Sequence, residues 1–463
     1  MIELTLQQIA SIVSGELTCS PELKVAQIST DSRFISEGEL FFALNGKHFD
    51  AHNYVVQVAV SGATAAVVSL PQSVDIPQII VADTLIALGK LGAWLKAQCQ
   101  IKAVAVTGSA GKTTVKELIA AILAKSANVL ATQGNFNNEI GVALTLLQLE
   151  KHYDFGVFEL GANHPGEIFQ TVSLVQPDVA VITNIGSAHL EGFGSIDGIA
   201  KSKGEIFSGL KAGGFAVLEA ENPYLTKFRD SLVGKELILW SVENNLEATV
   251  KATEIQLAPD SSQFVLVIGN LSVAINLPMA GLHNVKNALA AASACFVLGV
   301  GIAEIAQCLN AGVVVRRRLE LHKLAADLLV IDDSYNANLV STKAAIDVLV
   351  ADQNSATALV FGDMGELGKY ANKHHHKVGQ YARRQGVDAL FTLGSLSKLS
   401  FQEFAGAGAH SNDLETLMQQ LNDWLNLQEK TKRVLIKGSR SAAMERVLER
   451  LTKQGGPDVS LVY

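Results

Sequence analysis

A glycine-rich turn followed by a lysine and two threonines gives this sequence its clearest chemical signal. The turn lies in AVAVTGSAGKTTVKE (residues 103–117), between an apolar run and a helix-forming run. Glycines in such a turn let backbone N–H groups and a helix N-terminus face an anion, and Lys112 can reach terminal phosphates. The hydroxyl of Thr113 can ligate magnesium. The expected nucleotide-binding loop comprises Gly108, Ser109, Ala110, Gly111, Lys112, Thr113 and Thr114.

The match to the general phosphate-loop pattern is incomplete. The pattern G-x-x-x-x-G-K-[ST] requires glycine where this chain has Val106, whereas the shorter form G-x-x-G-K-T is present in full. A glycine turn that only joins a strand to a helix would not explain the Lys-Thr pair. We therefore predict a site for ATP with Mg²⁺.

Isolated metal ligands follow two further apolar runs. Glu159 ends the run in FELGAN, and His189 lies in TNIGSAHLEGFG, just beyond the next run. Ligands of doubly wound sheets bind outside the carboxyl ends of the strands, so both residues are expected to converge on Lys112. The following helix carries Lys201 and Lys203. The pattern leaves open whether these two lysines face the same crevice or form a solvated basic face.

Later segments suggest contacts to the nucleotide and to a substrate. In MAGLHNVKNALAA, Asn287 falls one turn into a helix, where its amide could read adenine, while Asn284 suits the helix N-cap. The triple arginine that ends at Arg318 is either a solvated linker or a phosphate contact. In IDDSYNAN, Asp333 and its neighbour Asp332 reach a strand end, where a carboxylate can hold a ribose hydroxyl.

Two other clusters of polar side chains suggest different roles. In IKGSRSAAME, Lys437, Ser439 and Arg440 follow a strand and could meet a substrate carboxylate. The run His374–His376 lies in the charged helical stretch NKHHHKVGQ, which argues against a metal site there.

These residues require a parallel sheet and a partner domain to position them. The chain has 463 residues, so two or three domains are expected. Residues 1–82 read as a small α/β domain, residues 83–313 as a central domain with a phosphate loop and parallel sheet, and residues 314–463 as a Rossmann-like α/β domain. A polar, alternating stretch from Glu247 to Asn276 predicts a few antiparallel strands.

Composition excludes several classes of protein. With 48% hydrophobic and 18% charged residues, the chain is typical of folded globular domains, and its net charge of -8 argues against nucleic acid as a partner. The chain has four cysteines that lack zinc-type spacing: Cys19, Cys99, Cys295 and Cys308. We expect them to be core residues of a protein that resides in a reducing compartment. The N-terminus does not resemble a signal peptide, and no membrane segment is predicted, so we expect a cytoplasmic protein.

The motifs resemble those of the Mur ligase family, in order and along essentially the whole chain. The strings that carry this resemblance include STDSR, FFALNG, TGSAGKTTVKE, TQGNFNNEIGVALTLL, ELGANHPGEI, NIGSAHLEGFGS, AKSKGEI, GLHNVKNALAA, DDSYNAN, GDMGELG and KGSRSAAME. The resemblance implies a three-domain, ATP-dependent ligase of peptidoglycan synthesis, and we expect a monomer. Its implied substrates are UDP-N-acetylmuramoyl-tripeptide, held by the first domain, and D-alanyl-D-alanine, carried by the third.

The resemblance also assigns roles to individual residues. It implies that Lys112, His189 and Lys203 are catalytic and that Lys203 carries a carbamate. The implied magnesium ligands are Thr113, Glu159, His189 and Lys203. The implied nucleotide contacts beyond the loop are Asn287, Arg318 and Asp333. The implied contacts to the muramoyl substrate are Ser32, Asn135, Asn137 and Asn138. One position departs from the family pattern, because Arg317 precedes Arg318 where glycine is usual.

The implied reaction converts the tripeptide carboxylate into an acyl phosphate, which the amine of the dipeptide then displaces. Two alternatives stay open at this point. The chain could be another ligase of the same family, such as the enzyme that adds the third residue or a folylpolyglutamate synthase, or it could be a kinase or ATP-gated binding protein. The sequence does not indicate whether the third residue of the tripeptide is diaminopimelate or lysine.

Overall fold

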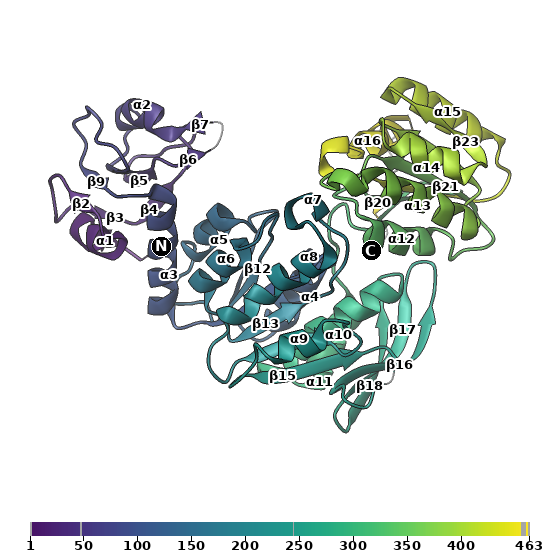
Figure 1. Ribbon diagram of the computed structural model, residues 1–463, viewed down its shortest axis with the longest axis horizontal. Helices are drawn as coiled ribbons and strands as arrows, with labels where there is room; N and C mark the ends of the chain where they lie inside the picture. The colour runs from purple at the N-terminus through teal and green to yellow at the C-terminus, as the bar shows by residue number, and fades with distance from the viewer. Residues whose placement is uncertain (1, 47–48, 244, 455–459, 462–463) are drawn as a thin grey trace.

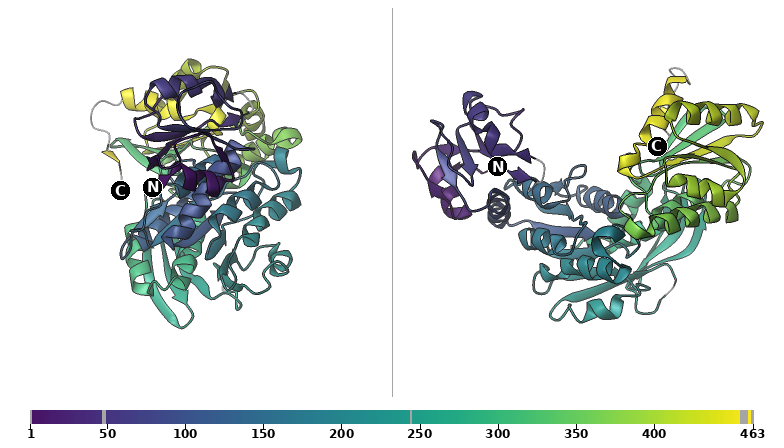
Figure 2. Two further views of the ribbon diagram at one scale, coloured as in Figure 1. Left: turned by 90° about the vertical axis from the view of Figure 1, so that its left-hand side faces the viewer. Right: turned by 45° about the horizontal axis from the view of Figure 1, so that its top comes forward.

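Three large β-sheets, each with its own helices, follow one another along the chain (Figure 1), and the two-stranded sheets β1-β3 and β6-β7 accompany the first of them. The computed structural model describes residues 2–46, 49–243, 245–454 and 460–461. The N-terminal and C-terminal units lie at opposite ends of the central unit, and the right-hand view of Figure 2 shows the same separation. The expected three-domain α/β architecture is confirmed.

The N-terminal unit is built on a five-stranded sheet of order β2-β9-β8-β5-β4. Its strands β4, β5, β8 and β9 pair in parallel, and β2 pairs antiparallel with β9. The sheet strands are β2 (Glu16–Leu17), β4 (Gln27–Ser29), β5 (Glu39–Phe42), β8 (Ala65–Val68) and β9 (Gln78–Ile80). The remaining elements are β1 (Leu4–Thr5), α1 (Leu6–Val13), β3 (Lys24–Val25), β6 (Asn45–Gly46), β7 (Phe49–Asp50), η1 (Ala51–Tyr54) and α2 (Val55–Val60).

A long helix, α3 (Thr84–Cys99), joins the N-terminal unit to the central unit. The Asp83 carboxylate caps it by accepting hydrogen bonds from the backbone N–H groups of Leu85 and Ile86. The helix packs against both α1 and α5 (Glu139–Leu146), so one apolar core runs through both units.

The central unit contains a nine-stranded sheet of order β11-β12-β10-β13-β14-β15-β16-β17-β18. The strands from β11 to β16 in this order pair in parallel, and β16, β17 and β18 form an antiparallel meander. The bounds are β10 (Lys102–Thr107), β11 (Val129–Ala131), β12 (Phe155–Glu159), β13 (Val179–Ile182), β14 (Phe215–Glu219), β15 (Glu236–Ser241), β16 (Val250–Leu257), β17 (Ser262–Ile268) and β18 (Leu271–Leu277). The meander confirms the antiparallel strands predicted between Glu247 and Asn276.

Helices cover both faces of this sheet, which explains why its inner strands are continuously apolar. Five successive residues of β10, from Ala103 to Thr107, are buried. The helices are α4 (Lys112–Leu123), α5, α6 (Glu167–Val175), α7 (Leu190–Phe193), α8 (Ile196–Gly204), η2 (Glu205–Ser208), α9 (Leu225–Arg229), α10 (Leu282–Val297) and α11 (Ile302–Ala311).

The C-terminal unit contains a seven-stranded sheet of order β23-β22-β21-β24-β20-β19-β25. Five strands pair in parallel, and β19 lies antiparallel between β20 and β25. The strands are β19 (Glu320–Ala325), β20 (Leu328–Asp333), β21 (Ala356–Gly362), β22 (Ala389–Leu393), β23 (Ala407–Ser411), β24 (Lys432–Lys437) and β25 (Ser460–Leu461). The helices are α12 (Leu339–Leu349), η3 (Gly368–Tyr370), α13 (Ala371–Arg384), α14 (Ser397–Phe404), α15 (Leu414–Leu427), η4 (Arg440–Ala442) and α16 (Glu445–Gln454).

Sheet membership changes twice along the chain, between Ile80 and Lys102 and between Leu277 and Glu320. The expected boundaries at residues 82/83 and 313/314 fall within these two intervals, and we propose them as the domain boundaries. In the part of the chain that the structure describes, no helix is both long enough and apolar enough to span a bilayer.

One expectation about the cysteines is wrong. Cys99, Cys295 and Cys308 are buried as expected, but Cys19 is exposed. It lies in the turn between β2 and β3, outside the core of the N-terminal unit.

Candidate active site

A cavity of about 830 Å³ lies between the central and C-terminal units. It opens at the carboxyl ends of β10, β12 and β13 on one side and of β20 and β24 on the other, which is where parallel sheets bind ligands. The sequence-predicted residues that line it are Ser109, Ala110, Gly111, Lys112, Thr114, Asn135, Asn137, Asn138, Glu159, His189, Asn287, Arg318, Asp333 and Lys437.

The phosphate-binding loop joins the end of β10 to the start of α4. Gly111 has a φ of 79°, in the left-handed region that favours glycine. A Cβ atom there would lie 2.4 Å from Oδ1 of Asn287, so the loop also requires glycine for lack of space. The unpaired N–H groups at the start of α4 face the cavity side of this loop and make it suited to an anion.

Residues directly after β13 hold the loop in this shape. Thr183 Oγ1 donates to the carbonyl oxygen of Ala110 over 2.6 Å, and the side chain of Asn184 both donates to that oxygen and accepts from the Ala110 N–H, each over 3.0 Å. Ser109 Oγ donates to the carbonyl of Gly186 and accepts from its N–H. Sequence analysis missed Asn184, whose only signal was its place at a strand end.

Lys112 occupies a dry position at the base of the cavity. Its Nζ donates to the carbonyl oxygen of Gly108 over 2.9 Å. Burial lowers the pKa of Lys112, the Glu159 charge opposes that shift, and the charge of Arg318 adds to it. A partly dehydrated ammonium interacts strongly with an incoming phosphate, because little solvent screens it.

Glu159 has the features of a magnesium ligand. The residue is 1% exposed, Oε1 accepts from Nδ2 of Asn137 over 2.8 Å, and Oε2 is buried without a hydrogen-bond partner. A buried carboxylate oxygen left unpaired is costly unless a cation or a proton satisfies it. Together with the Thr113 hydroxyl, it offers the oxygen ligands that Mg²⁺ prefers, so the residues fit this ion.

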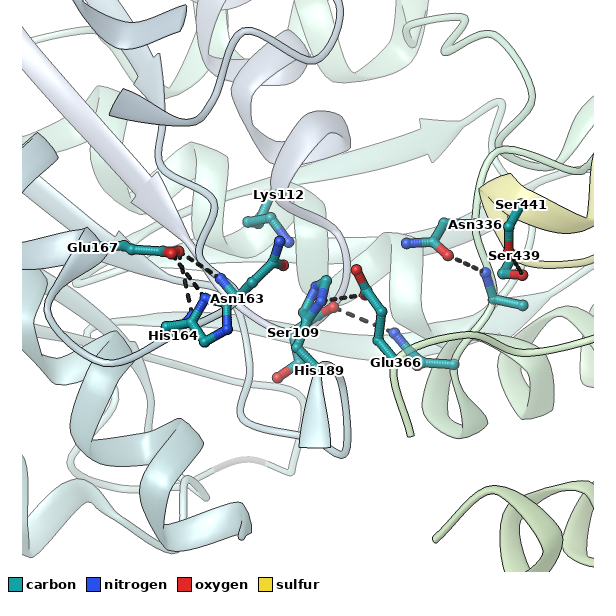
Figure 3. Close-up of polar contacts among 12 residues, drawn as sticks. Ser109, Lys112, Asn163, His164, Glu167, His189, Asn336, Glu366, Ser439 and Ser441 are labelled. Atoms are coloured by element: carbon teal, nitrogen blue, oxygen red, sulfur yellow. Dashed lines mark hydrogen bonds and ion pairs between the residues drawn. The ribbon is translucent and has the colours of Figure 1, made fainter. Parts of the chain in front are cut away.

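His189 makes a contact across the two units (Figure 3). Its Nδ1 lies 2.5 Å from Oε2 of Glu366, which comes from the loop after β21. The pKa of Glu366 is lowered, mainly by this hydrogen bond from His189. Sequence analysis quoted the segment GDMGELG but assigned no role to Glu366.

Lys203 is buried rather than part of a solvated basic face. It is 1% exposed within α8, whereas Lys201 is exposed. Burial lowers the pKa of Lys203 well below its ordinary value, and the charge of Lys112 adds to this shift. The neutral amine is therefore favoured at this position.

Three side chains of the C-terminal unit face the loop or the nucleotide region. Arg318 Nη2 donates to Thr113 Oγ1 over 3.0 Å, and its guanidinium lies 4.4 Å from the ring centre of Tyr335. Asn338 Nδ2 donates to the carbonyl of Ser109 over 3.4 Å. Asp333 pairs with Lys437, which also donates to the carbonyl of Asn336.

The expected adenine-side residues lie at the start of α10. Asn287 is buried and its Nδ2 donates to Oδ1 of Asn284 over 3.1 Å, which leaves its own Oδ1 directed toward the phosphate loop. Asn284 is not the N-cap that the sequence indicated. The cap is Gly281, and Asn284 instead donates to the carbonyl of Ala280.

Some predicted residues do not line this cavity. Ser32 belongs to the N-terminal unit, Ser439 Oγ donates to the carbonyl of Asp363 over 2.6 Å, and Arg440 pairs with Glu445 over 2.9 Å. Gly108, Thr113 and Lys203 are also not among the residues that line the cavity. The histidine run is structural, since His375 accepts from the Met364 N–H and contacts the Ala371 carbonyl.

The fold and the site define a nucleotide-dependent enzyme whose catalytic cavity is completed by two units. The chain matches the Mur ligase catalytic domain over residues 24–126, the Mur ligase middle domain over residues 106–295 and the Mur ligase glutamate ligase domain over residues 317–459. The chain belongs to the Mur ligase family.

Individual relatives match over nearly the whole chain. The UDP-N-acetylmuramoyl-tripeptide--D-alanyl-D-alanine ligase of Escherichia coli (strain K12) is 42% identical over 98% of this chain and 100% of its own length. The crystal structure of MurF from Acinetobacter baumannii superposes with a TM-score of 0.93 at 37% identity, covering 97% of this chain and 99% of that one. The MurF ligase of Thermotoga maritima, solved in complex with ADP, has a TM-score of 0.82 at 27% identity, over 93% and 97% of the two chains.

Proposed function

We propose that this chain joins D-alanyl-D-alanine to the terminal carboxylate of UDP-N-acetylmuramoyl-tripeptide in an ATP-dependent reaction of peptidoglycan synthesis. One observation carries the proposal: the phosphate loop and the buried, half-paired Glu159 face a cavity that the C-terminal unit closes. The names of the full-length relatives give the substrates. The product is UDP-N-acetylmuramoyl-pentapeptide.

The reaction proceeds in two displacements. An oxygen of the tripeptide carboxylate attacks the γ-phosphorus of ATP and ADP departs, which gives an acyl phosphate. The free amine of D-alanyl-D-alanine then attacks the acyl carbon, inorganic phosphate leaves with the bonding electron pair, and the amine loses a proton. No protein side chain forms a covalent bond in either step.

The chain contributes positioning and electrostatics. Loop residues 108–114 and Lys112 hold the phosphates, and the Lys112 charge stabilises the transferring phosphoryl group. Arg318 of the C-terminal unit donates a hydrogen bond to Thr113 of the central unit. Closure of these two units therefore brings the nucleotide side and the dipeptide side into one orientation. The enclosed cavity limits attack by water on the acyl phosphate.

Magnesium fits this site, and we propose Thr113, Glu159, His189 and Lys203 as its ligands. Bound Mg²⁺ supplies positive charge for the phosphate oxygens. Lys203 acts here as its carbamate, because CO₂ adds only to a neutral amine and burial favours that form. Addition of CO₂ to the buried amine, with loss of a proton, gives a carboxylate-like ligand.

The other substrate contacts extend the same proposal. Asn287 contacts adenine, and Asp333 contacts a ribose hydroxyl. The muramoyl substrate is faced by Asn135, Asn137 and Asn138. In the N-terminal unit, Ser32 contacts the uridine end of the same substrate. Lys437 lines the cavity and meets the substrate carboxylate, whereas Ser439 and Arg440 must leave Asp363 and Glu445 to reach it. The enzyme acts as a cytoplasmic monomer without nucleic acid.

An assay of ADP release tests the proposal. Purified protein with ATP and Mg²⁺ receives the UDP-muramoyl-tripeptide, D-alanyl-D-alanine, or both. We expect one ADP for each UDP-muramoyl-pentapeptide detected by mass spectrometry, and only when both substrates are present. Release of ADP that does not depend on the dipeptide would instead indicate a kinase or an ATPase.

A further inference from the structure

A histidine and two carboxylates gather on one face of the C-terminal sheet, outside the cavity. Glu320 and His322 lie two residues apart on β19, and Asp332 of β20 is directly opposite Glu320 in the antiparallel ladder. Side chains at such positions share one face of a sheet. Their ligand atoms all lie within 4.8 Å of one another.

Each of the three side chains has capacity for a further partner. Nε2 of His322 is buried without a hydrogen bond, and the nearest carboxylate oxygen, Oε1 of Glu320, is 3.7 Å away. The other oxygen of Glu320 accepts the Arg317 N–H over 2.8 Å, which fixes the carboxylate. Asp332 is 2% exposed, and its Oδ1 accepts the Ser334 N–H over 3.0 Å.

The cluster has an excess of negative charge. Burial raises the pKa of Asp332 and the charge of Glu320 acts in the same direction, while His322 opposes it. Neighbouring arginines do not compensate, because Arg317 pairs with Glu445 over 3.2 Å and Arg318 donates to Thr113. Two carboxylates this close require a cation or a proton.

We propose that Glu320, His322 and Asp332 bind one divalent transition-metal ion of the Zn²⁺ class. One imidazole nitrogen and two carboxylate oxygens, with water as a fourth ligand, are a usual donor set for zinc. Ligand bonds of about 2.0–2.2 Å require the three ligand atoms to approach one another, and the free oxygen Oε1 of Glu320 already lies 3.7 Å from Nε2 of His322.

The ion would join two segments that reach the catalytic cavity. Glu320 follows Arg318, which contacts the phosphate loop, and Asp332 precedes Asp333, which lines the cavity. Binding at this position therefore fastens the linker between the units to β20. The site differs from the proposed magnesium ligands in both its residues and its preferred metal.

Zinc titration of the full-length, metal-stripped protein tests the proposal, with a chromogenic chelator as the competitor. We expect His322→Ala to lose one equivalent of tight Zn²⁺ binding, with affinity at that site reduced by more than about 100-fold, because loss of even an outer partner of a ligand costs roughly 10–100-fold. His189→Ala should retain this equivalent, which separates it from the catalytic site.

Two further variants serve as a control and as a substitute for His322→Ala. His152→Ala removes an exposed histidine elsewhere and should bind Zn²⁺ as the parent does. If circular dichroism shows that His322→Ala is unfolded, Glu320→Ala takes its place with the same expected loss. Unchanged stoichiometry and affinity in the folded variant would overturn the proposal.

Discussion

His189 and Glu366 come from different units, and their side chains meet with 2.5 Å between Nδ1 and Oε2. Both residues have left-handed backbones, with φ of 54° and 58°. Such backbones are uncommon outside glycine and persist where the surrounding structure holds them. Because histidine ligands of metals usually direct their second ring nitrogen to a carboxylate, Glu366 is placed to orient His189 with Nε2 available for the ion.

Glu366→Gln should therefore weaken the response to magnesium. We expect the Mg²⁺ concentration for half-maximal ADP release to rise about 10–100-fold, the usual effect of losing a partner behind a metal ligand. Glu191→Gln is the matched control, since Glu191 is exposed and donates to the Glu366 carbonyl through its backbone N–H, which the substitution keeps. Equal Mg²⁺ dependence in the two variants would contradict the orienting role.

The same carboxylate predicts a pH effect on stability. The pKa of Glu366 is lowered from 4.5 by His189, so its contribution is complete above pH 4.5 and is lost as pH falls through the lower folded-state value. Its side chain is 54% exposed, which limits the contribution to about 1 kcal/mol or less. Unfolding free energies of the parent and Glu366→Gln should differ at pH 6 and converge on acidification; a difference that grows toward acid would be inconsistent with this sign.

Gly111→Ala should abolish nucleotide binding for a steric reason. The new Cβ would lie 2.4 Å from Asn287 Oδ1, so the loop must move. Gly213→Ala is the control, because Gly213 also has a positive φ, of 68°, but open space around it. Both variants should lose about 1–2 kcal/mol of stability, and calorimetric ATP binding should disappear only in Gly111→Ala. Normal binding by Gly111→Ala would refute the tight-turn account.

Lys203 should acquire a carbamate when the protein is exchanged into bicarbonate labelled with heavy carbon. Because burial lowers the pKa of Lys203, more of its amine is neutral than in an exposed lysine at the same pH, and the modification should be lost as acidification protonates it. The measurement is the carbamate carbon resonance in the nuclear magnetic resonance spectrum. The signal should vanish in Lys203→Arg and persist in Lys201→Arg, whose parent lysine is exposed.

The phosphate loop shows how much of the site local sequence can predict. Residues 108–114 specify their own geometry through glycine spacing and an adjoining strand and helix, so the loop, its strand and α4 were foreseeable. Glu159 and His189 were found because strand ends of a parallel sheet share one edge. Contacts between units carry no such local signal, and Glu366 was therefore missed. The burial of Lys203 likewise depends on how α8 packs, which periodicity alone left open between crevice and surface.

The C-terminal unit shows the same limit in its fold. Its strongly apolar strands β20, β21, β22 and β24 fit the Rossmann-like α/β domain expected over residues 314–463. Strand β23 was not, because AGAHS is weakly apolar and lies at the sheet edge, with its first residues exposed. Strand β19 was also missed, since ELHKLA alternates polar and apolar residues next to the triple arginine.

The central claim is that the tripeptide carboxylate becomes an acyl phosphate. Labelling that carboxylate with heavy oxygen isotope tests it directly, by mass analysis of the inorganic phosphate released during turnover with ATP and D-alanyl-D-alanine. If the acyl phosphate forms, each released phosphate carries one labelled oxygen, which the carboxylate transfers when the amide forms. Unlabelled phosphate accompanying the pentapeptide product would contradict it, because the carboxylate would then not have been phosphorylated.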